Sequence, residues 1–317
     1  MTLDSIVDGK KSVAISGHIR PDGDCVGSCL GVYNYLFKNY PQLDFHVFLD
    51  PIPNLFCFMK HSDAIEQAKD EDKVFDLFIC LDCGDLDRLG MASSYFKNAK
   101  TTLCIDHHLS NQAFAEYNII VPDSSSTCEL VYQAMNEDKI TKEVAECLYT
   151  GILHDTGQFQ YDCTSMTTME IAGKLMNFGI AYSDIVDKTM HTSTFEQVKV
   201  SAHAMLKAKR FYHQQIIASY ITKEEMKEFS VEAKHLNGIV AQLRNVKDVS
   251  VAIFLYELED EYKVSTRSSV DIDLSKLAMK YHGGGHAKAA GFSMQGNADE
   301  IIAVITADII SLLEELN

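Results

Sequence analysis

The first half of the chain alternates short, almost continuously apolar runs with longer segments in which apolar residues recur every three or four positions. Short apolar runs predict buried strands, and longer periodic segments predict helices. The predicted strands are residues 12–17, 45–49, 76–82, 102–106 and 118–121, and the predicted helices are residues 24–39, 127–138, 141–153 and 167–178. This alternation is typical of an α/β domain, a parallel sheet with helices on both faces, whose ligands gather at the carboxyl ends of the strands.

The pattern changes near residue 182. Residues 182–190 and 195–209 are predicted helices without an apolar strand between them. Beyond them the sequence predicts four strands and a closing helix, at residues 215–220, 249–256, 262–266, 291–294 and 298–315. This order is typical of a smaller α/β domain with a mixed sheet. We therefore expect a first domain over residues 1–186, a helical linker over 187–205 and a second domain over 206–317.

The length and the apolar content agree with two domains. At about 100–200 residues per domain, 317 residues fill two domains, and 46% apolar residues suffice for two cores. The chain has no apolar run of about 18 residues and no charged, apolar and small-residue leader, so we expect neither a membrane span nor a secretory signal. The expected location is the cytoplasm.

The nine cysteines are an odd number and are scattered singly through apolar runs. This distribution is typical of small buried side chains in a reducing compartment, not of a disulfide framework. Cys80 and Cys83 have the spacing of a zinc-finger pair, but no second Cys or His pair lies at a suitable distance. A zinc site at this pair is the minor alternative.

The net charge is -17, from 45 acidic and 28 basic residues. Such a field argues against binding a long polyanion through general electrostatics. A short nucleic acid or a small phosphorylated substrate is easier to hold, because metal ions and a few local cations can offset the repulsion.

Acidic and histidine side chains gather behind four apolar runs of the first domain. They are His18-Ile19-Arg20-Pro21-Asp22-Gly23-Asp24, then Asp82, then Asp106-His107-His108, and then Asp155. Because the carboxyl ends of parallel strands meet at one edge of a sheet, all four clusters are candidates for one cleft. Hard oxygen ligands mixed with imidazole are what a dinuclear divalent-metal hydrolase site needs.

Each cluster also has a structural alternative. An aspartate of the pair Asp22 and Asp24 could cap the helix predicted from residue 24, and Asp155 could be a cap or a surface acid. The cluster Asp106-His107-His108 is the sharper signal, because burying it behind a strand without a ligand is costly. It favours a metal or phosphate site.

In this order the four clusters resemble the motifs of the DHH phosphoesterase superfamily. Near the C-terminus, Gly283-Gly284-Gly285-His286, followed by Ala289-Ala290-Gly291, is similar to the glycine-rich signature of the DHH-associated C-terminal domain. Together the motifs span nearly the whole chain, which looks most like the stand-alone nanoRNase and 3'-phosphoadenosine-5'-phosphate phosphatase group. Two positions depart from the pattern: Cys25 stands where alanine is common, and His154 precedes the last acid.

The resemblance implies two divalent metal ions. One ion would be bound by His18, Asp22 and Asp82, and the other by Asp24, Asp82, His107 and Asp155, with Asp82 as the bridge. Water would be the nucleophile, His108 would contact the scissile phosphate and protonate the leaving oxygen, and Asp106 would orient the imidazoles. Mixed oxygen and nitrogen ligands with open positions favour Mn2+, with Mg2+, Co2+ and Fe2+ as alternatives. The resemblance also implies a homodimer through the N-terminal domain.

The second domain contains the predicted substrate-binding residues. Gly283, Gly284 and Gly285 would let backbone N–H groups approach a phosphate closely, with His286 beside them, and the alternative is a plain turn. Arg267 and Ser268, just after a predicted strand, are the second choice for a phosphate clamp.

The resemblance implies an enzyme that hydrolyses short oligoribonucleotides to mononucleotides and removes the 3'-phosphate of 3'-phosphoadenosine-5'-phosphate. The expected partners are short RNA or a small nucleotide, without a long duplex or a membrane. A phosphodiesterase for linear or cyclic dinucleotide signalling products and a non-catalytic nucleotide sensor are the alternatives. A family II inorganic pyrophosphatase fits poorly, because its phosphate loop is rich in lysine and arginine, unlike residues 283–286.

Overall fold

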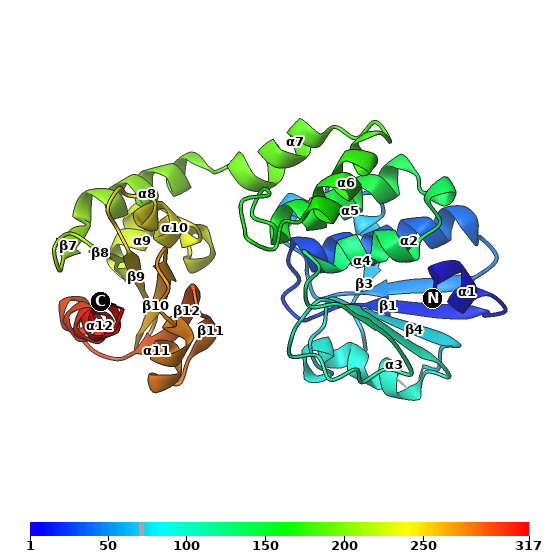
Figure 1. Cartoon of the computed structure of the whole chain (residues 1–317), viewed down its shortest axis with the longest axis horizontal. Helices are drawn as coiled ribbons and strands as arrows, with labels where there is room; N and C mark the ends of the chain where they lie inside the picture. Colours follow the sequence, from blue (N-terminus) through cyan, green and yellow to red (C-terminus); the bar gives the residue numbers. More distant parts are fainter. Residues whose placement is uncertain (70–72, 317) are drawn as a thin grey trace. The chain divides into compact units, whose positions relative to one another are not determined.

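The chain folds into two compact units, and the computed structural model describes residues 1–69 and 73–316. The first unit is Met1–Thr192 and the second is Ser193–Asn317 (Figure 1). The division lies inside residues 187–205, where the sequence predicts a linker.

The first unit is built on a six-stranded sheet in which all neighbouring strands are parallel. Its strands are β1 (Ser12–Ser16), β2 (Asp44–Phe48), β3 (Ile65–Glu66), β4 (Leu77–Leu81), β5 (Thr102–Asp106) and β6 (Tyr117–Ile120). Their order across the sheet is β3-β2-β1-β4-β5-β6. The predicted parallel sheet is confirmed, and β3 is a short edge strand that the sequence did not predict.

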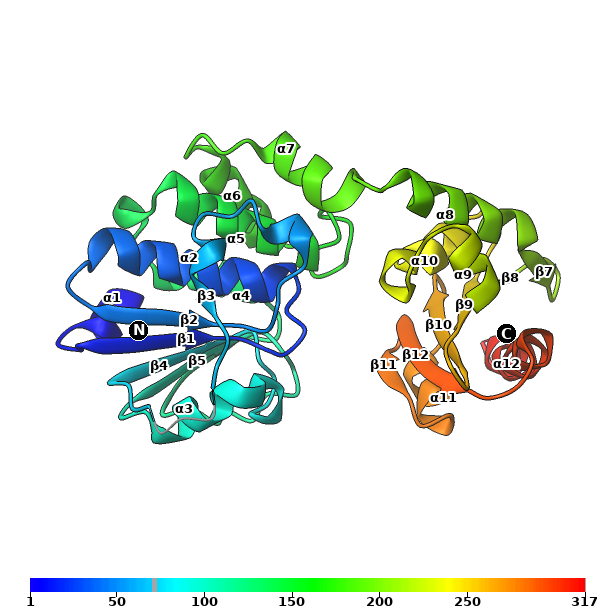
Figure 2. The ribbon, with the colours of Figure 1, turned by 180° about the vertical axis from the view of Figure 1, so that it is seen from behind.

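Helices cover both faces of this sheet. They are α1 (Leu3–Val7), α2 (Gly23–Asn39), α3 (Ser93–Asn98), α4 (Thr127–Ala134), α5 (Lys142–Asp155), α6 (Met166–Met176) and α7 (Tyr182–Val186), followed by a π turn at Asp187–His191. Val13 and Ile15 of β1 pack in the larger core with α2, α4 and α5, whereas Ala14 faces a smaller core with α3. Successive strand residues point to opposite faces, which produces these two layers (Figures 1 and 2).

The connections of the sheet reverse at its centre. The chain passes from β1 to β2 and β3 on one side, and then to β4, β5 and β6 on the other. In open parallel sheets such a reversal leaves a crevice at the carboxyl ends of the two central strands, where ligands bind. His18 follows β1 and Asp82 follows β4, so both predicted ligands lie at this crevice.

The second unit contains a six-stranded mixed sheet in the order β11-β12-β10-β9-β8-β7. Its strands are β7 (Lys209–Phe211), β8 (Ile216–Ile221), β9 (Val251–Glu257), β10 (Tyr262–Ser268), β11 (Gly284–His286) and β12 (Ala289–Met294), and its helices are α8 (Phe195–Lys207), α9 (Lys223–Glu228), α10 (Ile239–Arg244), α11 (Leu274–Lys280) and α12 (Ala298–Glu314). Strands β8 and β9 pair parallel and the other neighbours pair antiparallel. One core lies with α11 and α12 and another with α8 and α10, so the predicted mixed α/β fold is confirmed.

Two predicted helices end earlier than expected. The helix predicted over 127–138 stops early because Asn136 caps a separate 3₁₀ turn. The helix predicted over 195–209 stops early because Lys209 pairs with Ala218 in a hairpin. None of the helices in the described part of the chain combines the length and apolar character that a bilayer crossing requires.

The glycine run near the C-terminus forms an edge strand. Gly284–His286 pairs antiparallel with β12. A Cβ at residue 283 would collide with the backbone of Gly291, and Gly285 has a φ of 141°, so both positions need glycine. Strand packing thus accounts for these glycines, and their phosphate-binding role stays a prediction.

Candidate metal centre

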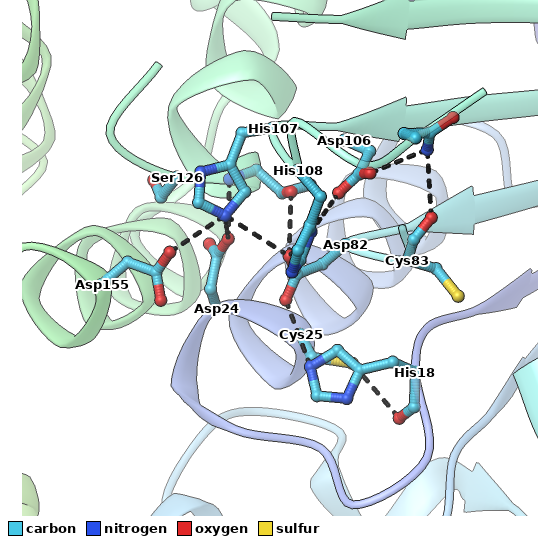
Figure 3. Close-up of polar contacts among 12 residues, drawn as sticks. His18, Asp24, Cys25, Asp82, Cys83, Asp106, His107, His108, Ser126 and Asp155 are labelled. Atoms are coloured by element: carbon cyan, nitrogen blue, oxygen red, sulfur yellow. Dashed lines mark hydrogen bonds and ion pairs between the residues drawn. The ribbon is translucent and has the colours of Figure 1, made fainter. Parts of the chain in front are cut away.

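Acidic and histidine side chains from four segments meet at the carboxyl edge of the first sheet (Figure 3). They come from β1 and the start of α2, from the ends of β4 and β5, and from the last turn of α5. In chain order they are His18, Asp22, Asp24, Asp82, Asp106, His107, His108 and Asp155. The structure thus brings together the residues that the sequence predicts for metal binding and catalysis.

Asp82 lies between three imidazoles. Its Oδ2 is 3.4 Å from Nε2 of His18, and its Oδ1 is 3.7 Å from Nε2 of His107 and 3.6 Å from Nδ1 of His108. The Asp82 side chain is 3% exposed, and it accepts a hydrogen bond of 3.2 Å from the hydroxyl of Thr127. A buried carboxylate with imidazoles on several sides suits a bridge between two cations.

Donor atoms converge closely enough to surround cations. Nε2 of His107 is 3.1 Å from Oδ2 of Asp155 and 4.0 Å from Oδ2 of Asp24. Three groups of side chains have ligand atoms within 4.8 Å of one another: His18, Cys25 and Asp82; Asp82, His107 and His108; and Asp24, His107 and Asp155. Carboxylate oxygen and imidazole nitrogen are ligands of divalent cations such as Mn2+ and Fe2+, so this donor set fits a metal centre.

Backbone carbonyls orient two of the imidazole rings. Nδ1 of His18 donates to the carbonyl of Ile19 at 2.8 Å, and Nδ1 of His107 donates to the carbonyl of Ser124 at 3.3 Å. Each ring therefore turns Nε2 toward the carboxylates, and this is the nitrogen that would bind a cation once its proton is displaced.

Asp24 is held by the first turn of α4. Its Oδ2 accepts the backbone N–H of Thr127 at 2.6 Å, and its Oδ1 accepts that of Cys128 at 2.9 Å. Burial, together with the negative charges of Asp82 and Asp155, raises the pKa of Asp24 well above its usual range. The N-terminus of a helix stabilises a carboxylate against this crowding.

His108 and Asp106 form a hydrogen-bonded pair beside the cluster. Nδ1 of His108 donates to Oδ1 of Asp106 at 2.7 Å, and the amide of Asn111 donates to Oδ2 at 2.7 Å. Burial raises the pKa of Asp106, but these two hydrogen bonds overcome it and the pKa lies below its usual value. The bond to Asp106 in turn raises the pKa of His108. His108 is thus placed to hold a proton on Nε2.

Protons or cations must balance the carboxylates of the cluster. Burial alone lowers the pKa of His18, but the hydrogen bonds with Asp22 and Asp82 overcome it and raise the pKa to about 12. Burial is likewise overcome at His107, where Asp155 and the charge of Asp24 raise the pKa to about 10. Divalent cations would supply this positive charge in place of the protons.

Asp22 departs from the expected arrangement. Its Oδ1 accepts the backbone N–H groups of Asp24 and Cys25, each at 3.2 Å, so Asp22 caps α2 as the structural alternative supposed. It is 3.6 Å from Nε2 of His18, but its side chain is 60% exposed. The ligand role of Asp22 stays a prediction.

The sequence pattern did not point to Asn111, Thr127 or Cys25. Asn111 lies in a loop where polar residues give no distinct signal, and Thr127 reaches Asp82 across a long sequence separation. Cys25 stands out in the sequence only as a departure from the family pattern. Its place beside His18 follows from the tight turn into α2.

Two other sequence features lie outside the donor groups. The ring of His154 packs edge-on against Phe56, its Nε2 is buried without a partner among the described residues, and burial lowers its pKa to about 4. Cys83 bonds the carbonyl of Asp85, and neither Cys80 nor Cys83 belongs to a candidate metal group in the described part of the chain. The zinc-finger alternative therefore gains no support.

The predicted substrate-binding residues lie in the second unit. Arg267 and His286 both stand opposite Ala289, on the strands to either side of β12, so the three side chains share one face of the sheet. Ser268 is buried, and its hydroxyl donates to the carbonyl of Val270 and accepts that residue's N–H, which gives it a structural role in a turn.

Comparison with known proteins agrees with this fold and site. Residues 12–152 match the DHH family, N-terminal domain, and residues 213–311 match the DHHA1 domain. The chain therefore belongs to the DHH phosphoesterases, metal-dependent hydrolases, and carries a DHHA1 domain.

The similar proteins match nearly the whole chain. The bifunctional oligoribonuclease and PAP phosphatase NrnA of Bacillus subtilis is 26% identical over 306 residues, covering 92% of this chain and 93% of the relative. The protein of the same name from Thermus thermophilus is 25% identical, covering 90% and 84%. The crystal structure of an exopolyphosphatase-related protein from Bacteroides fragilis superposes with a TM-score of 0.88 at 27% identity, covering 98% and 94%.

Proposed function

We propose that this protein hydrolyses short oligoribonucleotides to mononucleotides and removes the 3'-phosphate of 3'-phosphoadenosine-5'-phosphate. The observation that carries this proposal is the cluster around Asp82, in a chain that matches relatives named for both activities over 90% to 92% of its length. Both substrates contain a phosphoester bond to a ribose oxygen, so one site can act on both.

The cluster is proposed to hold two divalent cations. We assign His18, Asp22 and Asp82 to one, and Asp24, Asp82, His107 and Asp155 to the other. The four carboxylates carry four negative charges, which two divalent cations cancel. When bound, such a pair supplies an acidified water as nucleophile and neutralises charge on the phosphoryl oxygens. The mixed oxygen and nitrogen donors favour Mn2+, and Mg2+, Co2+ and Fe2+ are the alternatives.

His108 is proposed to protonate the leaving ribose oxygen. Its Nδ1 is occupied by Asp106, so the proton for transfer sits on Nε2. Asn111 fixes Asp106 on its other oxygen, which keeps the imidazole at one angle during the reaction. Because the leaving group is a ribose hydroxyl in both reactions, the same acid can protonate it in each.

The second unit is proposed to bind the terminal phosphate and base of the substrate. The shared face of Arg267 and His286 supports a phosphate clamp, to which the backbone of residues 283–285 would contribute, whereas the buried hydroxyl of the predicted Ser268 is engaged with Val270. The net charge of -17 disfavours the binding of long RNA. An anchor at a fixed place in the second unit would further favour substrates short enough to reach from it to the metal centre.

A cavity beside His18 supports a nucleotide substrate. It has a volume of about 130 Å³ and lies at the carboxyl ends of β1 and β2. The apolar side chains of Ile19, Phe48, Leu89 and Met91 line it together with the polar side chains of Ser16, His18, Asp50 and Gln67. This mixed lining, which includes the carboxylate of Asp50, suits a nucleobase with apolar faces and polar edges better than a second phosphate.

We further propose a cytoplasmic homodimer that forms through the first unit. Met166 and Met169 of α6 are 78% and 52% exposed, and such apolar side chains are typical of a surface that another molecule covers. Light scattering on the purified protein tests the dimer.

The substrate test uses Mn2+-supplemented protein and four compounds at equal concentration: a ribodinucleotide, adenosine bisphosphate, a linear product of a cyclic dinucleotide, and pyrophosphate. We expect the first two to be hydrolysed fastest. Faster turnover of the third would make the protein a signalling phosphodiesterase, and action on pyrophosphate alone would make it a pyrophosphatase. Nucleotide binding without turnover would make it a sensor. A ribonucleotide of about 24 residues should react more slowly than the dinucleotide, and equal rates would refute length selection.

A further inference from the structure

A cysteine sulfur lies inside the cluster of candidate ligands. The Sγ of Cys25 is within 4.8 Å of a ligand nitrogen of His18 and a carboxylate oxygen of Asp82. The three residues come from the loop after β1, the first turn of α2 and the end of β4. All three residues are buried, and Figure 3 shows the sulfur beside the His18 ring.

The surrounding backbone leaves room for this sulfur. A Cβ on Gly17 would collide with Sγ of Cys25, so the glycine at the end of β1 keeps the position open. The Sγ of Cys25 makes a weak contact of 3.8 Å with the carbonyl oxygen of His18 and also contacts the thiol of Cys29. Cys29, one turn further along α2, is equally buried but belongs to no donor group among the described residues. The two cysteines are thus equally buried, but only Cys25 lies close to the candidate ligands His18 and Asp82.

We propose that Cys25 is a ligand of the cation that His18 and Asp82 hold. This inference rests on the metal centre of the proposed function and adds a sulfur donor to it. As the sulfur–metal bond forms, the thiol loses its S–H proton to solvent and remains bound as the thiolate. With Asp22 included, the position then carries one nitrogen, one sulfur and two oxygen donors.

A sulfur donor changes which cations this position prefers. Thiolate is a soft ligand that selects ions such as Zn2+, Co2+ and Cd2+, whereas Mg2+ prefers oxygen. We therefore expect the ion beside His18 to be thiophilic, while the position formed by Asp24, His107 and Asp155 keeps only oxygen and nitrogen donors.

Cobalt spectroscopy tests the proposal without measuring catalysis. The full-length protein is stripped of metal, loaded with Co2+ and examined for the near-ultraviolet charge-transfer band of a sulfur–cobalt bond. We expect the band in the wild type and in the matched control Cys29→Ala, and its loss in Cys25→Ala and Cys25→Ser. In competition titrations, Cys25→Ala should weaken Cd2+ binding by about tenfold or more and leave Mg2+ binding nearly unchanged.

The outcomes separate this inference from the proposed function. A wild-type protein that binds Co2+ and hydrolyses the ribodinucleotide without a sulfur band overturns the ligand role of Cys25 and leaves the function standing. A band that persists in folded Cys25→Ala also overturns it. A wild type that binds no Co2+ and hydrolyses nothing overturns both. Far-ultraviolet circular dichroism checks the fold of each variant, and the wild-type spectrum decides the matter even if one variant fails to fold.

Discussion

Asp82 combines an unusual backbone with a central place among the imidazoles. Its φ is 53°, in the left-handed region that few residues other than glycine, asparagine and aspartate adopt. Strained backbone persists where the surrounding structure holds it, and such positions cluster at functional sites. Its carboxylate meanwhile contacts His18, His107 and His108, so one residue connects both halves of the proposed centre.

We expect Asp82→Ala to lower kcat on a ribodinucleotide by at least about 10³-fold, because a bridging ligand supports several kcal/mol of charge stabilisation. His286→Ala should keep more activity and raise mainly KM, because His286 lies on the exposed edge strand of the second unit. Steady-state kinetics with Mn2+ measures both, and circular dichroism serves as the folding control. Near-normal activity of Asp82→Ala would contradict the mechanism.

Glu225 joins α8 to α9 in the second unit. Its carboxylate contacts Lys207 and His203 and accepts the N–H of Thr222 at 2.8 Å. Burial raises the pKa of Glu225, but the bonds from Lys207 and His203 overcome it and lower the pKa from 4.5 to about 2. Because the folded-state pKa is depressed, the stabilisation is present above the unfolded-state pKa and is lost as the pH falls toward 2.

Glu225→Gln should therefore lower the free energy of unfolding at neutral pH by about 2 kcal/mol. The difference from wild type should shrink between about pH 5 and about pH 2. Urea titrations at several pH values measure it, with the exposed neighbour variant Glu224→Gln as the control. A difference that does not depend on pH would show that the ion pairs do not stabilise the fold.

At the scale of elements, α4 connects helix capping to the metal centre. Ser126 caps α4 by accepting the N–H of Glu129 at 3.1 Å. The N–H groups of Thr127 and Cys128, in the same turn, donate to Asp24. The carboxylate of Glu129 is buried and accepts hydrogen bonds from the hydroxyls of Ser125 and Thr168, which also hold this turn in place. The position of a candidate ligand thus depends on how firmly this helix begins.

Ser126→Ala and Thr141→Ala form a matched pair, because Thr141 caps α5 at the end far from Asp155. Each substitution should cost about 1 kcal/mol of stability. Ser126→Ala alone should also weaken Mn2+ binding, by about tenfold, since it loosens the turn that holds Asp24. Isothermal titration calorimetry measures the binding. Equal Mn2+ affinity in the two variants would show that the cap does not position Asp24.

The larger elements were predictable from the sequence because their signals are local. The apolar runs of β1, β4 and β5 and the periodic segments of α2 and α5 identify a parallel sheet with covering helices. The short strands β3, β7 and β11 were not predicted, because two or three residues carry no alternation and long-range pairing decides their conformation.

The same distinction applies to the site. The convergence of candidate ligands such as Asp82 and His107 was predictable because they follow apolar strands whose ends meet at one edge. Asn111 and Thr127 were not, because their roles come from contacts made only after folding. The capping bonds of Asp22 and the nearness of Cys25 likewise depend on the geometry of one turn.

At the scale of the whole molecule, the candidate ligands belong to one unit. His18 to Asp155 all lie within Met1–Thr192, and each unit has its own hydrophobic cores. Cation binding should therefore stabilise the first unit and leave the second unchanged.

Differential scanning calorimetry of the full chain should resolve two transitions. Adding Mn2+ to chelator-treated protein should raise the midpoint of one by several degrees, because cations relieve repulsion among the buried carboxylates. Fluorescence or hydrogen-exchange mass spectrometry assigns that transition to the first unit. Equal shifts of both transitions would mean that the cations also stabilise the second.

The reversal of strand order between β1 and β4 has one more consequence. His18 belongs to the half of the sheet that continues to β2 and β3, whereas Asp82 and His107 belong to the half that continues to β5 and β6. Cations bound by these residues would link the two halves of the sheet at the carboxyl ends of β1 and β4, where the chain connections diverge. Metal starvation would then remove more than the reaction, since the paired strands β1 and β4 would separate more easily at this end and expose their backbone to water and to proteases in the cell.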